Sequence, residues 1–161
     1  MWKWISILAV VVSGCAVTPT FEVPSRAMAP TIRFGSTVKA TPYGREKPQR
    51  FDVVVLGSPE TARVFVFRVI GLPGEYVSLT PDGVSINGVR LESPQGIRYS
   101  SGSMADVTPK TEFRLGKKNY VVLGDNVAHA RDSRFFGVIH ARRIYGKVSD
   151  IQEAAPDEQW Q

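Results

Sequence analysis

The 161-residue chain has a hydrophobic fraction of 43% and a charged fraction of 22%, values that are ordinary for one globular domain with its own core. Its formal net charge is +5 at pH 7, but the basic residues are scattered and form no stripe interleaved with aromatic residues, which argues against nucleic-acid binding. From this charge we expect weak attraction to an anionic membrane surface, or solubility alone.

The N-terminus carries Lys3, an apolar run from Ile5 to Val12, and small residues before the single cysteine, Cys15. This order is typical of a signal peptide, and the run is shorter than the roughly 20 apolar residues that span a bilayer. The box Val12-Ser13-Gly14-Cys15 resembles a bacterial lipobox. That resemblance implies that residues 1–14 are removed and that acylated Cys15 anchors the protein in the cell envelope, facing the periplasm. An ordinary signal peptide and a short uncleaved anchor are the alternatives.

The residue after Cys15 is Ala16 and not the aspartate associated with inner-membrane retention, so the same resemblance favours the outer membrane. We expect residues 15–23 to form a tether, residues 24–150 a β domain, and residues 151–161 a polar tail.

The hydrophobic pattern of the domain has the period of strands. Short apolar, β-branched or aromatic runs predict strands at 53–56, 62–70, 120–123 and 144–149. Within 84–90, Asn87-Gly88 predicts a type I′ hairpin turn, because both residues accept a positive φ. Residues 91–111 are rich in Ser, Gly and Pro and are expected to form a long surface loop or small insertion. Only short helical turns are expected, after Pro30 or near Phe135. Many short antiparallel strands predict a mainly β barrel or sandwich.

Four short boxes follow one another between Pro24 and Lys147. They are Pro24-Ser25-Arg26-Ala27-Met28-Ala29-Pro30-Thr31, then Tyr43-Gly44 through Val55, then Arg68-Val69-Ile70-Gly71-Leu72-Pro73-Gly74-Glu75, and finally Gly124-Asp125-Asn126 with Asp132-Ser133-Arg134 and Gly137. In content and order they resemble the boxes of type I (leader) signal peptidases, a family of Ser–Lys serine peptidases. The resemblance implies the β fold of that family. The chain departs from the family in its short N-terminal apolar run, since type I signal peptidases normally use transmembrane helices.

The resemblance also implies where the catalytic groups should stand. The nucleophile's position is occupied by Ala27, which has no lone pair with which to attack a carbonyl. The general-base lysine, which works in an apolar pocket that lowers its pKa, is replaced by Phe67. The serine that orients this lysine is replaced by Ala130. We therefore expect a protein that no longer hydrolyses peptides.

Ser25 matches the family position whose hydroxyl supports the oxyanion hole, so it is a remnant of the site. His129 is the one nearby base, and Ser25 with His129 is the only pair that could give an active peptidase with relocated residues. The remaining polar residues of the boxes are expected to form a structural network in which Asp132, Arg134 and Arg68 are linked. These residues are Asp52, Arg68, Asp125, Asp132, Ser133 and Arg134.

Three functions stay open at this point. The first is a catalytically silent, lipid-anchored relative that binds an extended peptide or an envelope protein as an added strand. The second is an active serine endopeptidase that uses Ser25 and His129. The third is a structural or assembly lipoprotein. No cofactor or metal is expected, because two histidines and one cysteine do not stand at ligand spacing and Gly71-Leu72-Pro73-Gly74 lacks the lysine of a phosphate loop.

A last expectation concerns packing at the altered positions. Losing two hydroxyls and a lysine would leave a hollow, and Phe67 has about the bulk to fill it. We therefore expect the Phe67 side chain to point inward, mostly buried, with its ring near Ala27 and Ala130.

Overall fold

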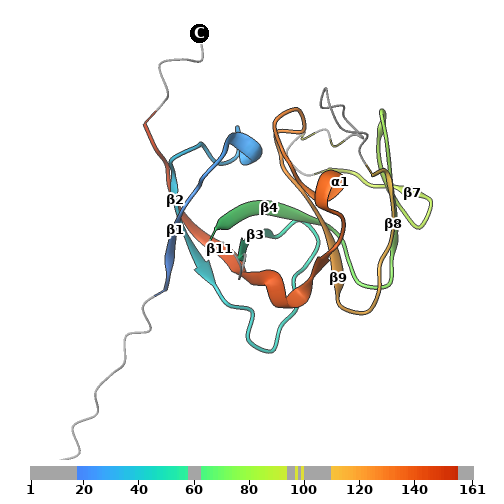
Figure 1. Cartoon of the computed structure of the whole chain (residues 1–161), viewed down its shortest axis with the longest axis horizontal. Coiled ribbons are helices and arrows are strands. Elements are labelled where there is room, and N and C mark those ends of the chain that lie inside the picture. The colour runs from blue at the N-terminus through green and yellow to red at the C-terminus, as the bar shows by residue number, and fades with distance from the viewer. Residues whose placement is uncertain (1–17, 58–62, 94–96, 98, 100–109, 156–161) are drawn as a thin grey trace, which may run out of the picture.

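The computed structural model describes residues 18–57, 63–93, 97, 99 and 110–155. They build two antiparallel sheets (Figure 1). The seven-stranded sheet curls into a half-barrel and has the order β1-β2-β11-β3-β4-β9-β10, and the four-stranded sheet has the order β7-β6-β5-β8. The prediction of a mainly β fold is confirmed.

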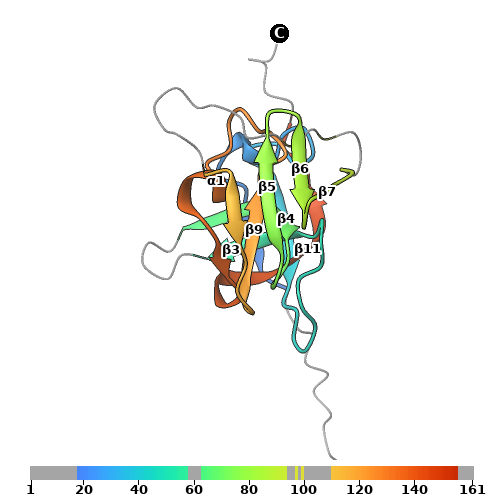
Figure 2. The ribbon, with the colours of Figure 1, turned by 90° about the vertical axis from the view of Figure 1, so that its right-hand side faces the viewer.

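The strands of the half-barrel are short, apart from β4 and β11. They are β1 (Thr20–Glu22), β2 (Thr37–Thr41), β3 (Val53–Gly57), β4 (Val64–Gly71), β9 (Asn119–Leu123), β10 (Ile139–His140) and β11 (Ile144–Gln152). The second sheet, seen face-on in Figure 2, contains β5 (Tyr76–Thr80), β6 (Gly83–Ile86), β7 (Val89–Arg90) and β8 (Glu112–Arg114). The helices are η1 (Arg26–Met28), α1 (Ser133–Phe136) and η3 (Ala141–Arg143). None of the helices within the described ranges is long and apolar enough to cross a bilayer.

The strands predicted from continuous apolar runs are present as β3, β4, β9 and β11. The predicted hairpin is also confirmed: β6 and β7 are joined by Asn87 and Gly88, whose φ angles are +51° and +82°. A helical turn is found near Phe135 as α1, whereas the turn expected after Pro30 lies before that residue, as η1.

Both ends of the domain differ from the expectation. The predicted tether at 15–23 contributes β1, which pairs with β2 in the register Thr20↔Lys39. At the other end β11 continues to Gln152, inside the predicted polar tail. Ser36 Oγ then donates to Glu153 Oε2 at 3.1 Å and accepts from the Ala154 amide at 3.0 Å. Both segments are ordered by partners that lie far away in the sequence. The lipobox and the signal peptide at 1–14 lie outside the described residues.

Strand β4 separates three hydrophobic clusters because its side chains alternate between faces. Phe67 and Val69 belong to one cluster, together with Val54. Val66 faces a second cluster with Met28 from η1 and with β2. The end of β4 and one face of β9 meet the second sheet in a third cluster, which contains Ile70, Val77, Leu79, Val84, Phe113, Val121 and Leu123.

Candidate functional site

The first box forms the 3-10 helix η1 and places Ala27 inward. Ser25 is its N-cap, and the Ser25 Oγ accepts a hydrogen bond from the Ala27 amide at 3.4 Å. The turn is closed by the Ile32 amide, which donates to the Met28 carbonyl at 2.9 Å. Ala27 is 3% exposed, whereas Ser25 lies on the surface. The capping role of Ser25 therefore holds the turn in shape and leaves its hydroxyl outside the core.

Strand β4 brings Phe67 to the same place. Phe67 lies opposite Val54 of β3 and is 2% exposed. Its ring stacks on that of Phe65, two residues earlier, with centroids 6.3 Å apart and planes at 8°. It also meets the ring of Phe136 from α1 at 5.9 Å and 54°. The prediction that the side chain of Phe67 points inward and is buried is confirmed.

The last box supplies Ala130 and locks it against η1. The backbone amide of Asn126 donates to the Ala27 carbonyl at 2.9 Å, and the Asn126 side chain donates to the Arg26 carbonyl at 3.2 Å. A Cβ atom added at Gly124 would stand 2.4 Å from the Ala130 Cβ and 2.5 Å from the Ala27 carbonyl oxygen. Only glycine fits where these two segments touch.

The three positions of the expected catalytic groups thus share one hydrophobic cluster. Ala27, Phe67 and Ala130, the last with 0% exposure, pack with Val54, Leu56, Val69, Tyr120, Val122 and Ile139. None of the three side chains can attack, accept or relay a proton. The resemblance placed these three positions in one region, and in the fold their apolar side chains pack together.

A buried ion pair stands behind this cluster. Arg68 donates from Nε to Asp125 Oδ1 at 2.9 Å and from Nη2 to Asp125 Oδ2 at 2.6 Å, a bidentate arrangement. The same carboxylate accepts from Thr31 Oγ1 and from the Tyr99 hydroxyl, each at 2.6 Å. Burial, reinforced by the Asp125 charge, raises the pKa of the Tyr99 phenol. Asp125 therefore fastens Thr31, which follows η1, Arg68 of β4 and Tyr99 to one point.

A second polar centre is built on Asp132. Its carboxylate accepts from the Gly124 amide at 3.0 Å and from Arg134 Nε at 2.9 Å, while Ser133 Oγ accepts from the Val122 amide at 2.9 Å. Arg134 Nη2 also donates to the Ala130 carbonyl at 3.2 Å. This centre fixes the loop that carries Ala130. Arg68, which we expected to join Asp132 and Arg134 in one network, pairs with Asp125.

Asp52 forms a third polar centre at the start of β3. It accepts from the Tyr43 hydroxyl at 2.7 Å and from the Gln49 amide at 2.9 Å, and it pairs with Lys147 Nζ at 2.7 Å. Burial raises the pKa of the Asp52 carboxyl, but the bonds from Lys147, the Gln49 amide and Tyr43 outweigh burial, and the net pKa is lowered.

The structure describes both residues of the alternative pair, Ser25 and His129. Ser25 and His129 are both exposed, and no hydrogen bond joins their side chains in the part of the chain that the structure describes. The His129 amide donates to the Asn126 carbonyl at 3.0 Å, so the residue belongs to a turn of the last box.

Sequence reasoning missed four residues that complete these centres: Thr31, Tyr43, Tyr99 and Lys147. Thr31 and Tyr43 lie inside the boxes, and that position is the sequence signal that could have identified them. Tyr99 and Lys147 gave no signal in the sequence, because their partners lie far away along the chain. Tyr99 contacts Asp125, 26 residues later, and Lys147 contacts Asp52, which is still more distant.

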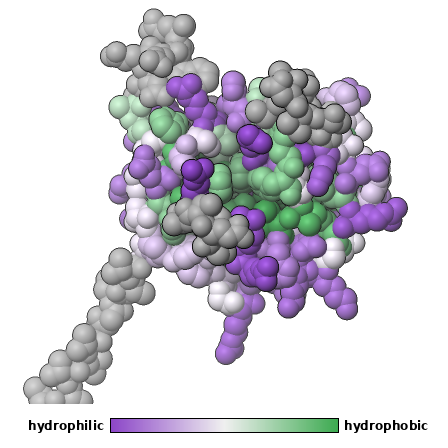
Figure 3. All heavy atoms as spheres, in the orientation of Figure 1, coloured by the Kyte–Doolittle hydropathy of each residue, from purple (hydrophilic) through white to green (hydrophobic). Residues whose placement is uncertain are grey.

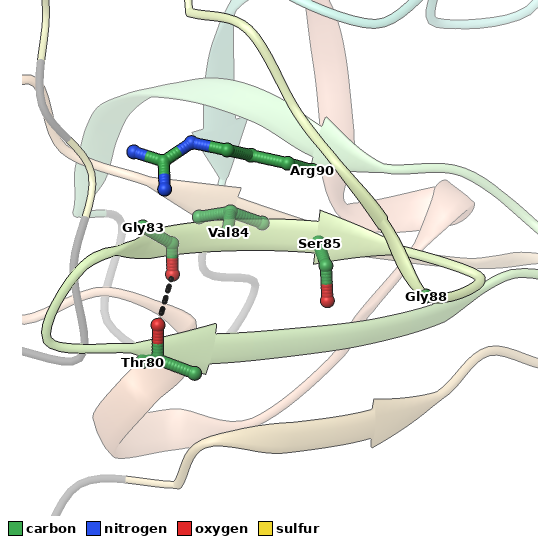
Figure 4. Close-up of a pocket in the computed structure, with 6 residues that line it drawn as sticks. All are labelled: Thr80, Gly83, Val84, Ser85, Gly88 and Arg90. Atoms are coloured by element: carbon green, nitrogen blue, oxygen red, sulfur yellow. Dashed lines mark hydrogen bonds between the residues drawn. The ribbon is translucent and has the colours of Figure 1, made fainter.

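A separate small pocket lies on the second sheet. It is lined by Thr80, Gly83, Val84, Ser85, Gly88 and Arg90 (Figure 4). Arg90 Nη2 donates to the Asp82 carbonyl at 2.9 Å, and Thr80 Oγ1 donates to the Gly83 carbonyl at 3.4 Å. None of its lining residues belongs to the cluster around Phe67. Within the described ranges no group of three His, Cys, Asp or Glu side chains could hold a metal ion.

Comparison with known proteins agrees with this arrangement. A family model described as "Signal peptidase, peptidase S26" matches residues 2–151. The chain is 32% identical to signal peptidase I V of Bacillus subtilis over 158 residues, covering 91% of this chain and 92% of that protein. It is 30% identical to signal peptidase IB of Staphylococcus aureus, covering 91% and 86%. A half-barrel with these boxes defines a signal peptidase-like protein, and the chain belongs to the signal peptidase family, peptidase S26.

Among solved structures, a signal peptidase I from Enterococcus faecalis is 29% identical and gives a TM-score of 0.49, covering 65% of this chain and 98% of that one.

Proposed function

We propose that this chain is a catalytically silent member of the signal peptidase family that binds an extended peptide or an envelope protein segment. The observation that carries the proposal is the shared apolar packing of Ala27, Phe67 and Ala130. Nucleophile, base and orienting group act as a unit in such a site, and loss of any one costs orders of magnitude in rate.

The surrounding frame supports retained binding. The Asp125 and Asp132 centres hold η1, β4 and the last box together without any catalytic group. An extended peptide that adds as a strand is held by backbone hydrogen bonds, which do not need the lost side chains. Binding can therefore outlast hydrolysis.

An apolar surface at this place offers contacts to such a peptide. Phe136, whose ring meets Phe67, is 44% exposed, and Phe65 is half-buried at the margin of the same cluster. Figure 3 shows apolar side chains gathered over the middle of this face, in the region of β4, β9 and α1. An exposed apolar patch of this kind commonly marks an interaction site.

We further propose that Cys15 is the lipid-attachment residue and that the protein faces the periplasm from the outer membrane. Support comes from the Val12-Ser13-Gly14-Cys15 box and from Ala16. The homologues of the chain are membrane-associated bacterial proteins.

Cleavage of a labelled signal-peptide substrate tests whether the chain is catalytically silent. The wild-type chain, Ser25→Ala and His129→Ala should all give the uncatalysed rate. A wild-type turnover that Ser25→Ala or His129→Ala abolishes would establish the relocated peptidase and overturn the proposal.

Binding is measured separately, by fluorescence anisotropy of a labelled extended peptide rich in small and apolar residues. Phe136→Ser should weaken binding about fivefold or more, as expected for removal of a large apolar contact. The matched control is Val89→Ser on β7, which is 70% exposed and outside the cluster, and it should bind as the wild type does. Equal affinity in all three proteins, or no binding at all, would contradict the peptide-binding proposal and leave a purely structural lipoprotein.

A further inference from the structure

One end of the domain collects basic side chains from three connections. These are the β2–β3 loop with Arg45 and Lys47, the β8–β9 turn with Lys117 and Lys118, and η3 with Arg142 and Arg143. In both Figure 1 and Figure 2 the three connections lie at the lower end of the molecule. We call this set of six residues the basic end.

The parts of the basic end formed by η3 and the β8–β9 turn are held side by side. The Ala141 amide donates to the Lys118 carbonyl at 2.8 Å, and His140 pairs with Asn119 in the β9–β10 ladder. The His140 Nδ1 accepts from the Arg142 amide at 3.2 Å, which caps η3, and Arg143 Nε donates to the Gly57 carbonyl at 3.4 Å. These contacts hold the two segments that carry four of the cations next to each other.

Among the described residues, the cations of the basic end are not paired with carboxylates. No salt bridge among the described residues involves any of the six. The neighbouring carboxylates are already engaged, Asp52 by Lys147 and Glu75 by Arg50. The acidic residues within the three connections are Glu46 and Asp52, and Asp52 is the one already paired with Lys147. This one end therefore carries an excess of charge as large as the +5 of the whole chain.

The N-terminal segment joins the domain at this same end. Strand β1 begins at the lower end in Figure 1, and in the sequence it follows the apolar run Ile5–Val12. Attachment of that segment to a membrane brings the basic end toward the lipid surface. Basic residues near an anionic surface are attracted over about a Debye length, roughly 8 Å at physiological salt.

We propose that the basic end binds the anionic head groups of the membrane and orients the domain on it. The occupant is a lipid surface and not an acidic protein, because the chain's own membrane-directed segment enters at this end. The proposal is independent of whether the Phe67 cluster binds a peptide.

Hydrogen exchange of the full chain reconstituted in nanodiscs tests this orientation. Discs of phosphatidylcholine are compared with discs containing 30% phosphatidylglycerol, a composition chosen to add negative charge. The amides of residues 116–118 and 141–143 should exchange several-fold more slowly in the anionic discs, and 0.5 M NaCl should abolish the difference. Equal exchange in both discs would overturn the proposal.

The variant K117E/K118E/R142E should lose the slowing in anionic discs. The matched control R90E/K110E/R131E changes the net charge by the same amount on other segments, and it should keep the slower exchange in anionic discs. If the charge-reversed variant fails to fold, K117Q/K118Q/R142Q replaces it with the same expected loss. Slowing by a soluble polyglutamate peptide with none from anionic discs would assign the basic end to an acidic polypeptide and contradict the lipid proposal.

Discussion

Phe67 decides how the altered site is packed. Its ring shares one cluster with Ala27 and Ala130, so the three residues form a complementary set in which two small side chains accommodate a large one. Phe67→Lys would bury an amine among apolar groups, at a cost of about 3 kcal/mol or more in the free energy of unfolding. Serines at 27 and 130 together should recover part of that loss, because their hydroxyls can accept from the amine.

Urea unfolding of F67K and of A27S/F67K/A130S measures this coupling. The control is Phe113→Lys, which places an amine in the other large cluster, where serines at 27 and 130 cannot reach it. The repacking account fails if the serines do not stabilise F67K, or if they stabilise F113K equally.

The Asp52 carboxylate gives a pH-dependent contribution with a definite sign. Its folded-state pKa is lowered, so its stabilisation is complete above the unfolded pKa of about 4 and is lost as pH falls through the folded value. Asp52→Asn should therefore lower the free energy of unfolding by about 1–3 kcal/mol at pH 7. The gap between wild type and variant should begin to shrink as pH falls below about 4 and should close below the folded pKa of Asp52.

Denaturant titrations at pH 7, 5 and 3 provide the comparison. Asp150→Asn, which removes a carboxylate from an exposed pair with Lys39, serves as the control and should change stability little at any of these pH values. A gap for Asp52→Asn that stays constant down to pH 3 would show that ionisation of this group does not matter.

At the scale of elements, the contact between η1 and the last box depends on Gly124. A methyl group there would meet the Ala130 side chain and the Ala27 carbonyl oxygen at distances no real Cβ adopts, and the backbone oxygen cannot turn away. Gly124→Ala should destabilise the domain by about 1–3 kcal/mol, as overpacking does. Gly57→Ala is the matched control in a strand, because nothing lies within 4 Å of its added Cβ. Thermal unfolding compares the two variants. Equal melting temperatures would show that the segments at this contact can shift to accommodate the added methyl group at little cost.

The elements that the sequence predicted are those whose own residues specify them. Strands β3 and β9 are continuous apolar runs, and the turn at Asn87-Gly88 carries its φ preference locally. Strand β1 is three residues long and exists because Lys39 and its neighbours pair with it, so no local pattern could indicate it. The positions of the site came from the boxes. The boxes did not predict the Arg68–Asp125 pair, since the last box contains two buried carboxylates and either of them could have paired with Arg68.

At the scale of the whole molecule, two accounts of membrane attachment compete. The family model matches from residue 2, so the N-terminal apolar segment lies within the region shared with the family, and an uncleaved segment could anchor the chain. The lipobox resemblance instead predicts removal of residues 1–14. Only five residue steps separate Cys15 from Thr20, where β1 begins, and they span at most about 17 Å when extended. A lipid on Cys15 would therefore hold the basic end close to the membrane surface.

The two accounts predict different mature proteins. With lipid attachment, mass spectrometry of the protein extracted from cell envelopes should find a chain that begins at an acylated Cys15. Cys15→Ser should leave an uncleaved, unacylated chain, because the thiol is the acceptor of the lipid. Ser6→Ala, a change within the apolar run that keeps the cysteine, should be processed as the wild type is. An intact Met1, or an unmodified Cys15, in the wild-type protein would assign attachment to the uncleaved N-terminal segment.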